Sequence, residues 1–195
     1  MWVVGLGNPG RRYAGTRHNV GHALVRALVE RWRAEPFARQ RTFHAYRALA
    51  DGPAPAVTLI APQAYMNRSG EALAAFAAAT GERPAAAQTL VACDDIYLPV
   101  GHLRLRSRGS TGGHRGLASV QEFFGTADYA RLRLGVGRAV GGELVEHVLS
   151  DFDEHDEDCV REALERAADA VETWLREGIL AAMNRFNRRV REVGP

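Results

Sequence analysis

Side chains that can move a proton or hold an oxyanion gather just after the first apolar run of the chain. The run Trp2 to Val4 is too short for a helix and is followed at once by glycines and a proline, which predicts a strand that delivers a loop. The loop carries Asn8, and His18 stands immediately before a helical pattern. Imidazole is well suited to accept a proton near neutral pH, so His18 is the candidate general base.

Two further apolar runs, ending at Ile60 and Cys93, are also followed by polar side chains. Asn67 comes after the first run and Asp94 directly after the second. In an open α/β sheet, ligands bind at the carboxyl ends of the parallel strands, so these side chains are expected to meet His18 there. A carboxylate bonded to one imidazole nitrogen fixes the tautomer and favours the cation formed at the other nitrogen, so we assign Asp94 to His18.

A nucleotide site fits the first loop less well. Gly5, Gly7 and Gly10 spell G-x-G-x-x-G, but in a dinucleotide site the third glycine opens the helix and an acidic residue ends the next strand about 20 residues on. Here Pro9 interrupts the turn, and the acidic residue at that distance, Glu30, falls within the first helix. No nucleotide cofactor is therefore expected.

The residues also argue against a metal site. His18 and His22 lie four apart, as zinc-binding histidines do, yet Asn19 stands where a zinc protease needs glutamate. Cys93 and Cys159 are far apart and lack C-x-x-C spacing. We therefore expect no metal.

The elements that must position these residues alternate between strand and helix patterns, which predicts one α/β domain across residues 1–195. Strands are expected at residues 2–4, 43–48, 57–60, 89–93, 102–106 and 132–136, the second and third joined as a hairpin through residues 51–53. Helices are expected at residues 20–28, from Ser69 as N-cap to Gly81, and at 117–124, 143–149, 157–177 and 178–191. The apolar run 89–93 predicts a central strand and the alternating run 102–106 an edge strand. The expected fold is a mixed, mostly parallel sheet with helices on both faces.

Charge is distributed unevenly along the chain, and every one of the 25 basic residues is arginine. Residues 100–140 hold seven arginines against two acids, whereas residues 143–177 hold thirteen acids against three arginines. Guanidinium groups grip phosphate with two prongs, so the first stretch suits a nucleic acid and the second does not.

Four of these arginines recur at every second position within two strands. Arg104 and Arg106 share one face of their strand, and Arg131 and Arg133 share one face of theirs. Such pairs suit successive phosphates of a backbone, although a solvated sheet edge would carry the same pattern.

Several short motifs occur in a fixed order along nearly the whole chain. They are Gly5-Leu6-Gly7-Asn8-Pro9-Gly10 followed by Tyr13, Thr16-Arg17-His18-Asn19-Val20-Gly21, Tyr65-Met66-Asn67-Arg68-Ser69-Gly70, Asp94-Asp95 with Leu98-Pro99, Gly109-Ser110-Thr111-Gly112-Gly113-His114 and Arg131-Leu132-Arg133-Leu134-Gly135-Val136-Gly137. In sequence and spacing they resemble the bacterial peptidyl-tRNA hydrolases.

The resemblance implies an ester hydrolase that cleaves the bond between the carboxyl end of a peptide and the terminal ribose of tRNA. It implies the same pairing of His18 with Asp94, and it places Asn8, Asn67 and Met66 around the scissile ester, where amides can donate to the oxyanion. It also implies a basic surface that holds the tRNA acceptor arm. The further positions implied in substrate or tRNA binding are Tyr13, Asn19, Tyr65, His114, Arg115, Arg104, Arg106 and Arg133.

One position departs from the family pattern. After His114 the family usually has asparagine, whereas this chain has Arg115, and a guanidinium can donate but cannot accept. Arg115 either turns outward toward a tRNA phosphate, which we favour, or lies against Asp94 or the substrate carbonyl.

The alternative function is a non-catalytic RNA-binding protein of the same fold. Retention of His18, Asp94, Asn8 and Asn67 favours the enzyme. The chain shows neither a charged-then-apolar leader nor an apolar run approaching 18 residues, so a cytoplasmic protein without membrane contact is expected. A monomer is also expected. Whether the glycine-rich loop and residues 143–149 move as a lid is left open.

Overall fold

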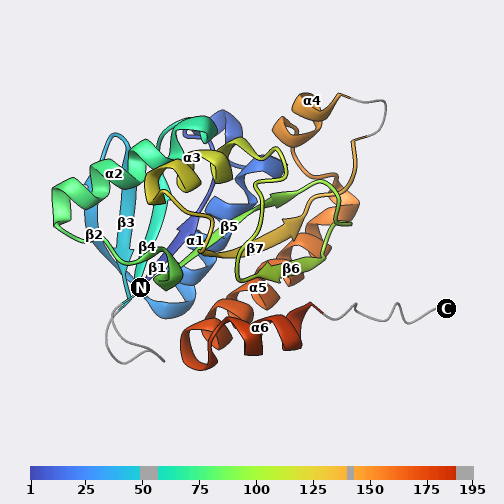
Figure 1. Ribbon diagram of the computed structural model, residues 1–195. Helices are drawn as coiled ribbons and strands as arrows, with labels where there is room; N and C mark the ends of the chain where they lie inside the picture. Colours follow the sequence, from blue (N-terminus) through green and yellow to red (C-terminus); the bar gives the residue numbers. More distant parts are fainter. Residues whose placement is uncertain (49–56, 140–142, 188–195) are drawn as a thin grey trace.

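The centre of the molecule is a seven-stranded sheet in the computed structural model, which describes residues 1–48, 57–139 and 143–187 (Figure 1). The strands run from one edge to the other in the order β2 (Glu35–Gln40), β3 (Phe43–Arg47), β4 (Thr58–Pro62), β1 (Trp2–Gly5), β5 (Thr89–Asp95), β7 (Ala130–Gly135) and β6 (Leu103–Arg106).

The sheet is mixed, as predicted. β1 is parallel to β4 and β5, and β5 is parallel to β7, whereas the β2–β3, β3–β4 and β6–β7 pairs are antiparallel. All seven residues of β5 are buried, and the strand lies inside the sheet. β6 alternates buried and exposed residues and lies at an edge, so the predicted central and edge strands are both confirmed.

Helices cover both faces of the sheet (Figure 1). α1 (Val20–Trp32), α5 (Glu157–Glu177) and α6 (Ile179–Phe186) pack on one face, and α2 (Ser69–Thr80) and α3 (Arg115–Phe124) pack on the other. Side chains of β1 alternate between the two faces: Val3 packs in the core under α1, α5 and α6, and its neighbours Trp2 and Val4 pack in the core under α2 and α3.

Two short 3-10 turns and one small helix lie where the parallel strands end. They are η2 (Arg17–Asn19), η3 (Met66–Arg68) and α4 (Leu144–Leu149). In Figure 1, α4 lies at the upper right, apart from the helices that pack on the two faces of the sheet. In the described part of the chain, no helix combines the length and apolar character needed to cross a membrane.

Three local predictions need correction. No strand is predicted at β2, which contains Pro36, is largely exposed and pairs with β3 across an irregular register. Ser69 does not cap α2: it is the first helical residue, entered from η3, and its hydroxyl donates to Met66 O. The last helix ends at Phe186 rather than near residue 191. The connection 51–53 and residues 188–191 lie outside the described residues.

Candidate active site

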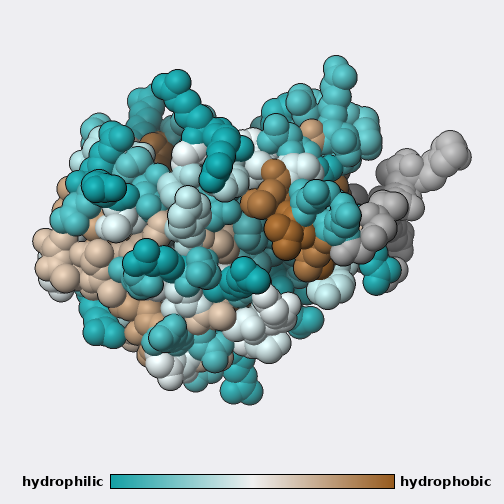
Figure 2. All heavy atoms as spheres, turned by 90° about the horizontal axis from the view of Figure 1, so that it is seen from above, coloured by the Kyte–Doolittle hydropathy of each residue, from teal (hydrophilic) through white to brown (hydrophobic). Residues whose placement is uncertain are grey.

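An open cleft of about 580 Å³ lies at the carboxyl ends of the parallel strands. Figure 2 looks onto this edge of the molecule and shows hydrophobic atoms gathered on the side where α4 lies. Nine of the predicted site residues line the cleft: Asn8, His18, Tyr65, Met66, Asn67, Asp94, His114, Arg115 and Arg133.

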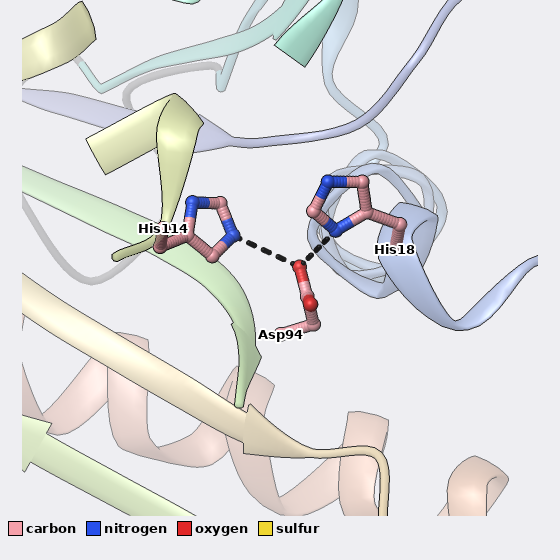
Figure 3. Close-up of side chains that lie close together, drawn as sticks. All are labelled: His18, Asp94 and His114. Carbon is pink, nitrogen blue, oxygen red and sulfur yellow. Dashed lines mark hydrogen bonds and ion pairs between the residues drawn. The ribbon is translucent and has the colours of Figure 1, made fainter. Parts of the chain in front are cut away.

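His18 is brought to Asp94 by a close approach of helix to sheet. A Cβ at Gly21 would lie 2.5 Å from Leu6 N and 2.6 Å from Ala92 O, so a glycine is needed for α1 to begin this near the ends of β1 and β5. The turn η2 thereby sets His18 Nδ1 at 2.7 Å from Asp94 Oδ1, and the pairing predicted from the sequence exists in the structure (Figure 3).

A second histidine donates to the same carboxylate oxygen. His114 Nε2 lies 3.0 Å from Asp94 Oδ1 (Figure 3). His114 is also the N-cap of α3, where its Nδ1 accepts the backbone N–H groups of Gly116 and Leu117 at 3.1 and 3.2 Å. An atom that accepts two N–H groups carries no proton, so His114 is held as the neutral Nε2–H tautomer and donates to Asp94.

Asp94 is ionised and accepts from both rings. Burial alone would raise its pKa, but the hydrogen bonds from His114 and His18 outweigh burial and hold the pKa well below the ordinary value. A carboxylate can only accept, so His18 Nδ1 carries a proton in the pair. The lone pair of His18 therefore lies on Nε2, which points away from Asp94 in Figure 3.

The three side chains could in principle surround a cation, because one ligand atom of each lies within 4.8 Å of the others. A metal at this point would need the Nε2 lone pair of His114. The N–H groups of Gly116 and Leu117 instead keep the proton on that nitrogen. The donor set therefore fits a hydrogen-bonded relay rather than a metal centre.

Asn8 presents a donor because its acceptor is occupied. Its Oδ1 accepts the backbone N–H of Met66 at 2.9 Å, which identifies the other end of the amide, facing the cleft, as the NH₂ group. Asn19 fixes the Asn8 backbone: its Oδ1 accepts from Asn8 N at 2.8 Å, and its Nδ2 donates to Asn8 O at 2.9 Å. Asn19 is buried behind the cleft, so its contact in the structure is with Asn8.

The remaining cleft amide and its neighbour lie at the surface. Asn67 is exposed within η3, and Tyr65, which is 54% exposed, precedes it at the rim. The glycine-rich loop contributes Gly112 and Gly113 to the same cleft. The amide of Asn67 is thus free to meet a bound molecule.

The four arginines of β6 and β7 share one face of the sheet. The register pairs Arg104 with Arg133 and Arg106 with Arg131. Arg104 and Arg106 are exposed, whereas Arg131 is buried over the Tyr129 ring, 4.1 Å from its centroid. Arg104 and Arg106 lie outside the cleft lining, along a basic edge that continues from it.

Arg133 connects this basic edge to the cleft. Its Nη1 donates to Asp95 Oδ2 at 3.3 Å, and its Nη2 donates to the carbonyls of Ser110 and Thr111. Asp95 is buried and also accepts from Tyr97 N. Asp95 therefore orients Arg133. The sequence does not reveal this role, because it shows Asp95 only as the neighbour of Asp94 and does not show that Arg133 lies next to it.

Two predicted binding residues lie toward the margins. Arg115 lines the edge of the cleft at the start of α3 and is exposed, and the hydrogen bonds to Asp94 come from the two histidines. Tyr13 is half-buried in a 3-10 turn, with the Arg12 guanidinium 4.6 Å from its ring centroid. The outward placement of Arg115 remains a prediction.

One wall of the cleft is apolar, and part of it comes from residues 143–149, whose role as a lid the sequence leaves open. α4 contributes Leu144, Val145, Val148 and Leu149, and the chain after β5 contributes Ile96 and Tyr97. The amphipathic pattern of residues 143–149 predicts a helix but does not identify a wall of the cleft, which the structure shows, with Val145 65% and Tyr97 70% exposed.

Comparisons with known proteins agree along the length of the chain. The family model described as Peptidyl-tRNA hydrolase matches residues 2–193. Curated proteins of that name from Symbiobacterium thermophilum and Chloroflexus aggregans are 48% and 46% identical to the chain, covering 95% and 96% of it and 97% and 99% of the relatives. The crystal structure of peptidyl-tRNA hydrolase from Acinetobacter baumannii superposes with a TM-score of 0.84 at 30% identity, over 95% of this chain and 93% of that one.

Proposed function

The chain belongs to the peptidyl-tRNA hydrolase family, and on this premise we propose that it hydrolyses the ester between peptide and 3'-terminal ribose in peptidyl-tRNA with His18 as general base. The observation that carries the assignment is the 2.7 Å contact between His18 Nδ1 and Asp94, which leaves Nε2 as an acceptor at the cleft. Free tRNA and peptide are the products.

The proposed reaction begins with a water molecule hydrogen-bonded to His18 Nε2. As its oxygen bonds to the ester carbonyl carbon, one proton passes to Nε2, and the Asp94 carboxylate stabilises the imidazolium. The carbon–oxygen bond to the ribose then breaks, and His18 returns the proton to the ribose oxygen. Water, ester and imidazole supply every proton and electron pair that this reaction needs.

The negative charge that develops on the carbonyl oxygen is assigned to two amides. Asn8 offers its NH₂ group because Met66 N occupies its oxygen, and Asn67 is exposed beside it. Such donors act best when held in place before the reaction, and the buried Asn19 supplies this for Asn8. Losing one such donor typically costs about 100- to 1,000-fold in rate.

The tRNA is proposed to lie along the β6–β7 edge. Arg104 and Arg106 are exposed there, and Arg133 leads from that edge into the cleft. Phosphates bound to these groups would orient the acceptor end toward His18. Tyr13 and Tyr65 offer rings, and Arg115 a further cation, to the same end of the tRNA.

The peptide is proposed to lie against the apolar wall of α4. Leu144 and Val145 face the same cleft as Met66, so side chains near the peptide's carboxyl end would be sheltered from water there. We infer that the protein works as a cytoplasmic monomer, in keeping with a role in translation.

An RNA-binding protein without catalysis would also use the basic edge. That alternative is disfavoured because binding alone needs neither the hydrogen-bonded pair of His18 and Asp94 nor the Asn8 amide that Met66 N holds at the same cleft.

Release of labelled peptide from N-acetylated peptidyl-tRNA, with unblocked aminoacyl-tRNA as the control substrate, tests the proposal. We expect turnover of the first substrate and little of the second. Tight tRNA binding without release would favour the alternative.

A further inference from the structure

Arg17, the residue before His18, reaches into the segment that follows α4. Its Nη1 donates to Ser150 Oγ at 2.8 Å and also to the carbonyl of Asp151, and its Nη2 pairs with Asp153 Oδ2 at 3.0 Å. One guanidinium thus binds three residues that lie more than 130 positions further along the chain.

Main-chain contacts join the same two segments. Arg17 N donates to Ser150 O at 3.0 Å, and Thr16 forms an isolated antiparallel bridge with Asp151. The Arg17 guanidinium also lies 5.1 Å from the ring centroid of Phe152. Arg17 is only 5% exposed, whereas the side chain of Asp153 is 64% exposed, so the guanidinium is buried while its carboxylate partner lies at the surface.

The helix that this anchor holds has little packing of its own. No residue of α4 is buried, and Leu144 and Val145 are 45% and 65% exposed. A second tether is His147 Nε2, which lies 3.2 and 3.0 Å from the carbonyl oxygens of Val136 and Gly137. Polar contacts near its end and along its length therefore set the position of the apolar wall.

The turn η2 connects this anchor to the reacting groups. Its three consecutive residues each hold a different part of the site: Arg17 the α4 segment, His18 the carboxylate of Asp94, and Asn19 the backbone of Asn8. One short turn therefore positions the apolar wall of α4, the base His18 and the oxyanion donor Asn8 relative to one another.

We propose that Arg17 is a positioning residue that holds the apolar wall of α4 in register with His18 and so sets the affinity for the peptide part of the substrate. The inference rests on the proposed function. Because the contact of His18 with Asp94 does not pass through the Arg17 side chain, its loss should weaken peptide binding more than it slows the chemical step.

The fork of Arg17 is suited to this position. A planar guanidinium can serve a hydroxyl, a carbonyl and a carboxylate at once, whereas a lysine ammonium is a point charge that can keep the Asp153 pair but cannot span the same set. Arg17→Met removes every donor at similar length, and Arg17→Lys keeps the charge. Arg161→Met is the matched control, since Arg161 lies on α5, is exposed and pairs with Asp158.

The experiment compares steady-state kinetics on two substrates, tRNA carrying one N-acetylated residue and tRNA carrying an N-acetylated apolar tripeptide. For Arg17→Met we expect KM for the tripeptidyl substrate to rise about tenfold, the range of one misplaced apolar contact, with less than about threefold change for the single-residue substrate. Arg17→Lys should lie between wild type and Arg17→Met. Arg161→Met should match wild type on both.

A second readout does not depend on turnover. Amide hydrogen exchange at residues 144–149 should accelerate in Arg17→Lys and Arg17→Met but not in Arg161→Met, while exchange in α3 stays unchanged. If Arg17→Met fails to fold, Ser150→Ala and Asp153→Ala each remove one contact from the other side and should raise KM in the same direction by less.

Equal losses on the two substrates, or unchanged KM and exchange in α4, would overturn the role of Arg17. Absence of turnover in the wild-type protein would instead refute the proposed function. The two failures are therefore distinguishable.

Discussion

Replacing His114 with asparagine should keep the N-cap of α3 and remove the hydrogen bond to Asp94. Asparagine is a good N-cap and can still accept the N–H groups of Gly116 and Leu117, but it is too short to reach Asp94. The helix α3 keeps its cap, and the carboxylate keeps only the donor from His18. We therefore expect a folded variant in which Asp94 interacts more strongly with His18.

The size of the effect follows from the contact that is lost. A hydrogen bond to a charged group contributes about 1.5–3 kcal/mol, and one pH unit corresponds to about 1.4 kcal/mol. If roughly half of the lost interaction is transferred to His18, the imidazolium gains about 1 kcal/mol. The acid limb of the kcat/KM profile should then move to higher pH by about half to one unit.

The stability of the variant should change with a defined sign. The pKa of Asp94 lies below its ordinary value, so its hydrogen bonds stabilise the folded protein above the pH where the unfolded carboxyl ionises, about 4, and this is lost as pH falls through the native pKa. His114→Asn should lower the free energy of unfolding by about 1–2 kcal/mol at pH 7. The difference should shrink in acid.

The assay is kcat/KM for peptide release measured across pH, with urea unfolding of both proteins at pH 7 and at an acid pH well below 4, where the contribution of Asp94 is being lost. An acid limb that stays in place or moves to lower pH in a folded His114→Asn protein would refute the hydrogen-bonding scheme around Asp94.

The other predictions concern charge at and around the cleft. Asp94→Asn should lower kcat/KM by about 100-fold or more and move the acid limb to lower pH, opposite to His114→Asn; an unchanged profile would break the pairing with His18. Arg104→Ala should make the salt dependence of tRNA binding shallower by up to about 0.9 in log K per log salt, while the exposed Arg161→Ala on α5 should not; equal slopes would reduce β6 to a solvated edge. Arg115→Asn should preserve or raise turnover and weaken tRNA binding modestly, and a large loss of turnover at unchanged affinity would place Arg115 in the reaction.

Much of the fold follows from patterns local to single elements. The apolar run of β5 and the alternating run of β6 each indicate their place in the sheet, because burial on one or both faces leaves a periodic trace. β2 leaves no such trace, since it is an exposed edge strand that contains Pro36. Its pairing with β3 is a tertiary outcome that propensity does not encode.

The site shows the same division. His18 and Asp94 can be paired from the sequence because both follow strands whose ends must meet. The second donor, His114, is predicted as a substrate contact, since nothing local says that its ring reaches Asp94 while capping α3. Arg17 likewise looks like part of a motif until the fold brings residues 150–153 to it.

The central claim, that His18 is the base that activates water, is tested most directly by single-turnover peptide release by His18→Ala at saturating enzyme, with tRNA affinity measured in parallel. We expect release to fall to the uncatalysed rate while affinity stays within about twofold of wild type, because the proposed phosphate contacts are those of the arginines on β6 and β7. Substantial release by the pure variant would contradict the assignment of His18.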